Sequence, residues 1–223
     1  MAVGFRIGVA RPVADPALIA RFAQIPVACI SDAMRRLVAG GARLRPIGKA
    51  RMTGPAFVVK TAPGDNLMVH KAIALAQPGD ILVVDAGGDV TNAIIGERMV
   101  TVAHQRGLAG FIINGAIRDA DTLRTHEFPV FAAGVTHRGP YKNGPGEINY
   151  PIAIDGMVIE SGDVIAADED GFVCIPIRDA DAVCNAAEDK FAQETNNAPV
   201  LEGGDKADDK LRALGCEFPG DAK

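Results

Sequence analysis

Residues 96–119 read GERMVTVAHQRGLAGFIINGAIRD, and the fold class is most clearly visible in this segment. Its first half repeats apolar residues at helical spacing, with Ile95, Met99 and Val102 on one stripe, and the pattern breaks at Gly107. An unbroken apolar run follows, which predicts a strand buried on both faces and ends in Arg118-Asp119. Because ligands of open α/β sheets gather at the carboxyl ends of strands, we expect a ligand site at this strand end.

The same alternation of helix and strand patterns extends to both sides of this stretch. We expect strands at 51–61, 81–85, 111–114 and 129–133, and helices at 66–76 and 119–125. Alternation of this kind is typical of parallel βα units. N-terminal helices are expected at about 16–40, in two pieces broken near Pro26. Asp15 is expected to cap the first piece and Ser31-Asp32 the second.

The pattern changes in the second half of the chain. Residues 136–148 are polar and rich in Gly and Pro, which predicts a long surface loop of functional or interface character. Short strands joined by Gly-containing turns follow up to about residue 176 and favour antiparallel pairing. A C-terminal helix is expected at about 178–196, and the tail at about 199–223 is expected to be flexible. We expect one compact α/β domain over 1–223, with parallel βα units followed by short antiparallel strands.

Composition and charge narrow the function classes. The chain has 223 residues, is 48% hydrophobic and carries a formal net charge of -5 without a basic run, which argues against a nucleic-acid partner. No segment approaches the about 20 apolar residues of a membrane span, and no signal peptide is recognised, so we expect a cytoplasmic protein without a membrane partner. The four cysteines match neither a zinc ribbon nor a CxxC pair and are interpreted as structural.

Three charged residues carry the candidate chemistry. The planar guanidinium of Arg118 suits a carboxylate or enolate oxygen, and Asp119 is a hard oxygen ligand for Mg²⁺ or Mn²⁺. Glu97 lies in the first turn of a predicted helix, where the N–H groups of Arg98 and Met99 could face a bound anion. Each residue also fits a plainer interpretation. Arg118 and Asp119 could form a surface ion pair or cap a helix, and Glu97 could stabilise the start of its helix through the helix dipole.

Two other residues stay open at this point. Asp85 ends an apolar strand and could either contact the site or cap the following loop. His70 lies near the start of a helix and could donate a hydrogen bond to a residue that itself binds the ligand, although a structural histidine is the commoner case.

Five segments together resemble the class II pyruvate aldolases that cleave 4-hydroxy-4-methyl-2-oxoglutarate and 4-carboxy-4-hydroxy-2-oxoadipate. This family shares its fold with the regulator of ribonuclease activity A. The segments are ISDAM at 30–34, DNLMVHKAIALAQPGDILVVDAGG at 65–88, GERM at 96–99, RGLAGFIINGAIRDADTL at 106–123 and GDVIAADEDGFVCIP at 162–176. The resemblance spans about residues 30–194 and implies a fold of the swivelling β/β/α type.

The resemblance also implies roles for individual residues. Arg118 is implied to bind substrate and act in catalysis, Asp119 to hold the divalent metal, and Glu97 to hold a water near the metal where the family often has Asp. Backbone N–H groups at Gly96, Glu97, Arg98 and Met99 are implied to bind the pyruvyl carboxylate, although the family has leucines in place of Arg98 and Met99. Glu194 is implied to reach the site of a neighbouring subunit in a homotrimer or homohexamer.

The reaction implied is a Mg²⁺- or Mn²⁺-dependent retro-aldol cleavage. A small anionic oxo acid, a 4-hydroxy-2-oxo dicarboxylic or tricarboxylic acid, would yield pyruvate and a second oxo acid, and oxaloacetate would lose CO₂ through the same pyruvate enolate. Three alternatives stay open: a non-catalytic protein-binding regulator, another lyase or hydratase, and a methyltransferase. The last has little support, because Gly87-Gly88 lacks the spacing of a nucleotide-binding loop.

Overall fold

A computed structural model describes residues 2–9, 12–37, 42–196 and 205–219. The chain divides into two units, Met1–Phe191 and Ala192–Lys223. The sheet and all three hydrophobic clusters lie in the first unit. The second unit holds the end of one long helix and a further helix. A single domain over residues 1–223 stays a prediction.

A large mixed sheet organises the first unit, with the strand order β1-β8-β3-β4-β6-β7-β2. In addition, β5 pairs with β6, and β11 joins β3 to β12. The strands are β1 (Phe5–Ile7), β2 (Arg45–Pro46), β3 (Met52–Thr61), β4 (Ile81–Asp85), β5 (Ala93–Ile95), β6 (Gly110–Ile117), β7 (Val130–Val135), β8 (Gly146–Ile148), β9 (Ile152–Ile154), β10 (Met157–Ile159), β11 (Val164–Asp168) and β12 (Gly171–Ile175).

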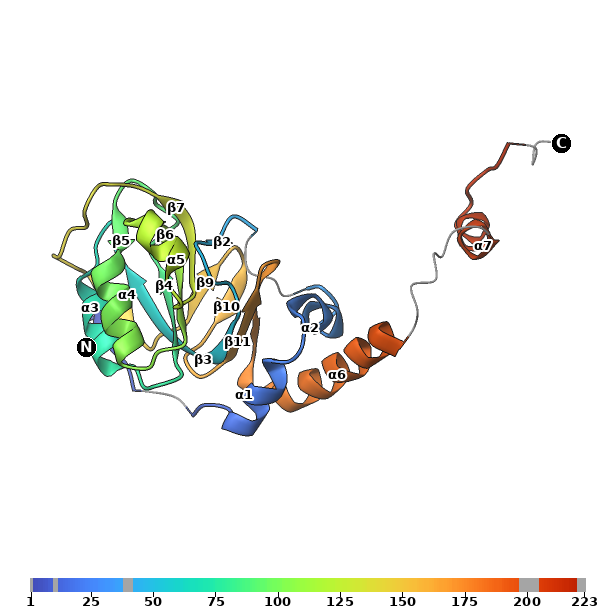
Figure 1. Cartoon of the computed structure of the whole chain (residues 1–223), viewed down its shortest axis with the longest axis horizontal. Helices are drawn as coiled ribbons and strands as arrows, with labels where there is room; N and C mark the ends of the chain where they lie inside the picture. The colour runs from blue at the N-terminus through green and yellow to red at the C-terminus, as the bar shows by residue number, and fades with distance from the viewer. Residues whose placement is uncertain (1, 10–11, 38–41, 197–204, 220–223) are drawn as a thin grey trace. The chain divides into compact units, whose positions relative to one another are not determined.

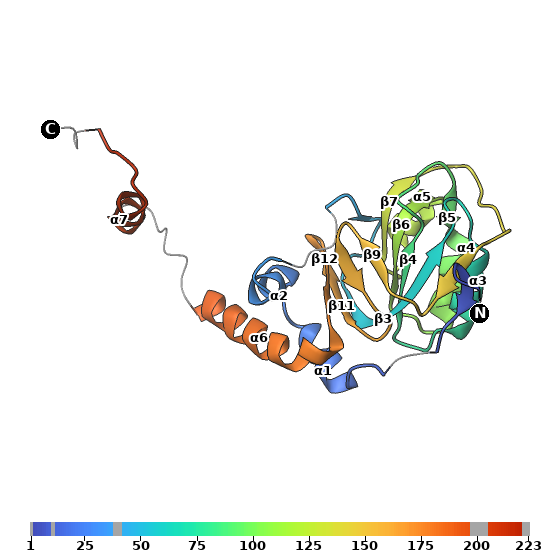
Figure 2. The ribbon, with the colours of Figure 1, turned by 180° about the vertical axis from the view of Figure 1, so that it is seen from behind.

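Seven α-helices accompany these strands in the described part of the chain. They are α1 (Pro16–Phe22), α2 (Val27–Ala33), α3 (Leu67–Leu75), α4 (Glu97–Gln105), α5 (Ala120–Thr125), α6 (Ala180–Asn196) and α7 (Asp205–Ala213). A single 3₁₀ turn, Ile177–Asp179, leads into α6. In the first unit, α3, α4 and α5 cover one side of the sheet, while α1, α2 and the start of α6 lie beyond the β11–β12 ribbon (Figures 1 and 2).

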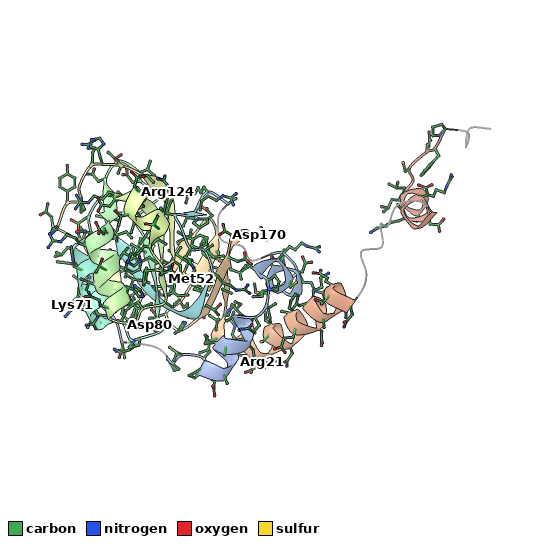
Figure 3. All side chains as sticks on the ribbon, viewed as in Figure 1. Arg21, Met52, Lys71, Asp80, Arg124 and Asp170 are labelled. Atoms are coloured by element: carbon green, nitrogen blue, oxygen red, sulfur yellow. The ribbon has the colours of Figure 1, made fainter. Side chains whose placement is uncertain are left out.

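The central strands β3, β4, β6 and β7 run parallel, and β4 and β6 are buried along their whole length. Alternate residues of β4 enter different clusters: Leu82 and Val84 face α3 and α4, whereas Ile81 and Val83 face the β9–β12 layer. Met52, labelled in Figure 3, belongs to that second cluster. Burial on both faces explains why β4 and β6 are nearly continuous apolar runs, as the sequence predicts.

A third cluster seals the outer face of the β11–β12 ribbon with α1, α2 and α6. Its largest fully buried members are Phe22 and Ile30. The molecule is therefore a layered, mixed α/β fold with parallel strands followed by short antiparallel ones, and the predicted fold class is confirmed.

Most predicted elements agree with the structure, but the start of α2 was predicted wrongly. The helix begins at Val27 directly after Pro26, and Ser31-Asp32 lie inside it. Its first N–H is capped by the Asp168 side chain of β11, with 2.9 Å between Val27 N and Asp168 Oδ2. A cap supplied from 141 residues away cannot be found from local sequence.

The structure also adds elements that the sequence patterns did not reveal. The last three residues of the predicted 136–148 loop form β8, which pairs with β3 and β1. The short strands β1, β2 and β5 were not expected, because none spans enough residues to show a period. Within the segment expected to be a flexible tail, α7 forms a helix.

Across the described residues, no helix is both long enough and apolar enough to span a membrane.

Candidate active site

The strand β5 brings the two halves of the candidate site together. It pairs in parallel with β6, so that Ile95 lies opposite Ile117. The N–H of Arg118 continues this ladder by donating to the carbonyl of Ile95 at 3.0 Å. Gly96, which is the N-cap of α4, therefore lies beside Arg118 and Asp119 at the carboxyl end of β6. This pairing explains how residues that are 22 positions apart form one local structure.

Asp119 is turned toward α4 and away from its own helix. Its backbone adopts a left-handed conformation, with φ 59° and ψ 36°, and its side chain makes no capping bond to α5. Instead, Oδ2 accepts a hydrogen bond from the N–H of Glu97 at 3.0 Å. Left-handed backbone is uncommon for residues other than glycine, and Asp is one of the few that adopt it readily. The helix-cap interpretation of Asp119 therefore does not apply to α5.

Gly96 allows this close approach. A Cβ atom added at Gly96 would lie 2.9 Å from Cγ of Arg118 and closer still to the carboxylate of Asp119. The backbone of Gly96 is extended, with φ −153°, so the need for glycine is steric and not conformational.

We expect Gly96→Ala to displace the Arg118 and Asp119 side chains and to lower catalytic turnover by at least about tenfold, since small misplacements of positioned groups are costly. Steady-state kinetics with the reaction proposed below would measure this loss. Gly156→Ala controls for a loss of stability alone: it strains a turn with φ 88°, but no atom lies within 4 Å of the added Cβ and the residue is not part of the cavity lining, so turnover should be unchanged. Unchanged kinetics in Gly96→Ala would show that the packing around Asp119 is not important.

A loop after β7 passes beside Arg118, and the side chains of Asn92 and Asp65 are among the groups that hold its backbone. The Asn92 side chain donates to the carbonyl of Gly139 at 2.6 Å, and a Cβ added at Gly139 would lie 3.3 Å from Nη1 of Arg118. Further along, the buried carboxylate of Asp65 accepts from the N–H groups of Asn143 at 2.5 Å and Gly144 at 3.0 Å. The predicted surface loop is thus an anchored wall of the site.

A cavity of about 460 Å³ opens between α3, α4, the end of β6 and this loop. Of the seven predicted site residues, five line it: Gly96, Arg98, Met99, Arg118 and Asp119. The ion pair between Arg118 Nε and Asp119 Oδ2 is 3.8 Å long, and both side chains are more than a third exposed. A pair of this length and exposure adds little to stability, so the surface-ion-pair interpretation does not explain the arrangement.

The other two predicted site residues, Glu97 and Glu194, are not part of the cavity lining. The Glu97 side chain is exposed and is not part of the cavity lining, although its backbone N–H holds Asp119. Glu194 is an exposed residue of α6 in the second unit. Their predicted catalytic roles stay predictions.

The first turn of α4 offers fewer open donors than expected. The N–H of Met99 is directed to the carbonyl of Gly96 at 3.1 Å, and the N–H of Glu97 is bound to Asp119. The N–H of Arg98 has no hydrogen-bond partner among the residues that the structure describes. Arg98 is therefore the donor of this turn that remains open to an anion.

Asn66, His70 and Lys142 also line the cavity and were not assigned to the site from the sequence. Desolvation and the neighbouring charge of Lys142 lower the pKa of His70, which favours the neutral imidazole. Asn66 is 2% exposed, and its Oδ1 is a buried acceptor without a hydrogen-bond partner in the described structure. Only the four-residue spacing between Asn66, the N-cap of α3, and His70 within α3 could have indicated that both residues face one cavity.

Asp85 caps the loop that follows β4, which is one of the two roles that the sequence left open. Its Oδ1 accepts from the N–H of Gly87 at 3.0 Å and from the Asn114 side chain at 2.8 Å. It therefore holds the turn after β4 and is not part of the cavity lining.

The donor set fits a magnesium-like ion. Within the described ranges, no three His, Cys, Asp or Glu side chains converge as a metal site. Mg²⁺ is commonly bound through only one or two carboxylates, with water and substrate oxygens completing its shell. Asp119 meets that need, because its Oδ1 accepts no hydrogen bond from the residues described and its side chain is 40% exposed at the cavity.

The RraA-like family model, described as Aldolase/RraA, matches residues 27–174, which include this whole site. The chain belongs to the RraA-like family. A relative from Halalkalibacterium halodurans, provisionally named as a 4-hydroxy-4-methyl-2-oxoglutarate aldolase, is 41% identical over 177 residues, which cover 79% of this chain and 84% of the relative. A 4-hydroxy-4-methyl-2-oxoglutarate aldolase of Thermus thermophilus is 32% identical over 129 residues, 58% of this chain and 78% of that protein.

Solved structures show the same RraA fold. Streptomyces coelicolor RraAS2, described as an unusual member of the RNase ES inhibitor RraA protein family, superposes with a TM-score of 0.76 at 25% identity, over 83% of this chain and 97% of that chain. The RraA-like family therefore joins proteins named as aldolases and proteins described as ribonuclease inhibitors.

Proposed function

We propose that this RraA-like protein is a carbon–carbon lyase that cleaves 4-hydroxy-2-oxo dicarboxylic or tricarboxylic acids to pyruvate and a second oxo acid. The aldolase names of its relatives point to 4-hydroxy-4-methyl-2-oxoglutarate as the first substrate to test, with 4-carboxy-4-hydroxy-2-oxoadipate as the second. One observation carries the proposal: a guanidinium and a carboxylate meet at a helix N-terminus in a single cavity.

Arg118 would stabilise the charge that develops as the bond breaks. When C3–C4 cleaves, its electron pair moves to C3 and spreads to the C2 oxygen, giving the enolate of pyruvate, while C4 becomes a carbonyl carbon. A donor that is already in position at this oxygen lowers the barrier without reorganisation. The loop at Gly139 lies beside Nη1 of the Arg118 guanidinium, which lines the cavity. The open N–H of Arg98 is suited to the C1 carboxylate of the substrate.

Asp119 would hold the divalent metal, Mg²⁺ or Mn²⁺. When bound, the metal supplies Lewis-acid polarisation of the 2-oxo group. The hydrogen bond from the N–H of Glu97 fixes Oδ2 of Asp119 and leaves Oδ1 for this role. No lysine is needed for a Schiff base in this scheme.

Two carboxylates are candidates for taking the proton of the C4 hydroxyl through a water molecule. The first is Glu97, which is near Asp119. The second is Glu194, which would reach the site from a neighbouring subunit if the protein forms a homotrimer or homohexamer with sites at its interfaces. The C3 carbon of the enolate takes a proton from water to complete pyruvate. Oxaloacetate would reach the same enolate by losing its C4 carboxylate as CO₂, which makes its decarboxylation a side activity.

The test is pyruvate release from 4-hydroxy-4-methyl-2-oxoglutarate, followed with a coupled dehydrogenase. We expect turnover with Mg²⁺ or Mn²⁺, loss of turnover with excess chelator, and recovery when metal is added back. Asp119→Asn should bind Mn²⁺ more weakly by calorimetry and should also lose activity. Undiminished turnover in the chelator would show that the metal role is wrong, and the absence of pyruvate with every oxo acid would refute the lyase.

A non-catalytic regulator is the second candidate, favoured by the likeness to RraAS2. It predicts no pyruvate release and binding to a protein partner. A regulator has no need of an open guanidinium and carboxylate in one cavity, which is why the lyase is the first candidate. Failure of the purified protein to release pyruvate, with metal binding intact, would favour the regulator.

A further inference from the structure

The charged side chains of the cavity are strongly one-sided. Four are cationic and one is anionic: Arg98, Arg106, Arg118 and Lys142 against Asp119. The lining therefore has a formal excess of three positive charges, in a chain whose net charge is -5. A cavity of this kind favours a ligand with more than one negative charge.

Two of these cations have no part in the proposed chemistry. The guanidinium of Arg98 and the ammonium of Lys142 are exposed, and neither makes an ion pair or hydrogen bond within the part of the chain that the structure describes. Arg106 differs, because it donates to the carbonyl of Ala74 at 3.0 Å. Arg98 and Lys142 are thus available to a ligand.

The backbones that carry these two cations are well anchored. Arg98 is the second residue of α4. Lys142 stands between Tyr141 and Asn143, whose N–H groups donate to Gly64 O at 2.8 Å and to Asp65 Oδ2 at 2.5 Å. Two cationic side chains from separate elements therefore extend from anchored backbone positions in the cavity wall, an arrangement suited to selecting a ligand by its charge.

A buried acceptor in the same wall independently indicates a ligand. The Asn66 side chain donates through Nδ2 to the carbonyl of Ile94 at 2.9 Å, which settles its orientation. Its Oδ1 is left without a partner in the described structure. An unpaired buried acceptor is costly, and a ligand hydroxyl can supply the missing donor.

We propose that Arg98 and Lys142 are the specificity-determining residues of the site and bind a second carboxylate at the end of the substrate away from its 2-oxo group. This inference rests on the proposed function and deepens it. Arg118 and Asp119 serve the reacting end, so a substrate whose distal end is uncharged would leave Arg98 and Lys142 unpaired. Arg98 can bind a carboxylate with two parallel hydrogen bonds, and Lys142 acts as a point charge.

The decisive comparison uses two substrates with the same reacting part, 4-hydroxy-2-oxoglutarate and 4-hydroxy-2-oxopentanoate, which differ in a distal carboxylate or methyl group. We expect the wild type to prefer the dicarboxylate by at least about tenfold in kcat/KM, the size expected for a charged hydrogen bond. Arg98→Met and Lys142→Met should each reduce this preference through KM for the dicarboxylate. Arg98→Lys should retain part of it, and Arg124→Met, on the exposed surface of α5, should change nothing.

A binding measurement separates failure of this inference from failure of the lyase. Calorimetry with glutarate and butyrate, two unreactive probes, should show tighter binding of glutarate to the wild type and loss of that difference in Arg98→Met. Equal handling of charged and uncharged distal ends by the wild type would overturn the inference, as would equal losses for both substrates in the variants. If pyruvate is never released but glutarate is still selected, the lyase fails and the anion selectivity stands.

Discussion

Arg118→Ala is expected to lower kcat by about 10²- to 10³-fold, the usual cost of removing one donor aimed at a developing oxyanion. The physical reason is that the alanine leaves the C2 oxygen of the enolate without its guanidinium partner. The measurement is steady-state pyruvate release at saturating metal. Arg118→Lys should recover only part of the rate, because an ammonium retains the charge but not the planar fork of donors.

The folded state should tolerate this change. Arg118 makes one long ion pair, to Asp119 at 3.8 Å, and its side chain is 44% exposed. Surface pairs contribute about 0–1 kcal/mol, so the thermal midpoint of Arg118→Ala should lie within a few degrees of the wild type. Arg124→Ala is the matched control, since Arg124 is an exposed arginine paired with Asp121 on α5 (Figure 3). An active Arg118→Ala would remove the basis of the proposed mechanism.

Asp65→Ala is expected to destabilise the protein by about 3 kcal/mol, because each lost hydrogen bond to a charged group costs about 1 kcal/mol or more. The buried carboxylate accepts from three N–H groups, those of Leu67 at 2.9 Å, Asn143 at 2.5 Å and Gly144 at 3.0 Å. For a chain of this size, such a loss lowers the thermal midpoint by about 6–12 °C. Thermal unfolding followed by circular dichroism measures it.

This variant should also loosen the wall that carries Lys142, and selectivity for a charged distal group should fall with it. Asp15→Ala is the control for Asp65→Ala. The Asp15 carboxylate accepts from the N–H of Ala17 at 2.7 Å, two residues ahead as in the Asp65–Leu67 pair, but it is exposed and lies at the start of α1, away from the loop. We expect its midpoint to shift far less. A small effect of Asp65→Ala would mean that the loop is held by its other contacts alone.

Much of the fold could be predicted because its signals are local. The runs that form β4 and β6 are almost entirely apolar, since both faces of each strand are buried. The stripe predicted for α4 is confirmed at Met99 only: Ile95 belongs to β5, Val102 is exposed, and the other buried residues of the helix are Val100 and Ala103. The position of Arg118-Asp119 at the end of a strand also follows from such patterns. These features need only the chemistry of neighbouring residues.

Other parts of the site could not be predicted because their causes are distant in the chain. The strand β5 is three residues long and shows no period, yet its pairing with β6 places Gly96 against Asp119. The N-cap of α2 is Pro26, whose side chain cannot accept a hydrogen bond, and the acceptor comes instead from Asp168. A short pattern cannot encode a partner that only the folded chain brings near.

Local patterns in the sequence were enough to predict the layered α/β class, the order of the longer helices and strands, and the charged residues at one strand end, because periodicity and turn chemistry act over a few residues. That Arg98, Lys142 and Asn66 share a cavity with Arg118 depends on the folded chain. That sharing depends on the β5–β6 pairing and on the carboxylate of Asp65, which binds backbone 78 residues away. Contacts between residues so far apart in the sequence form because both faces of the sheet must be buried and buried hydrogen-bond donors must find acceptors. Both requirements are met only when the whole chain folds.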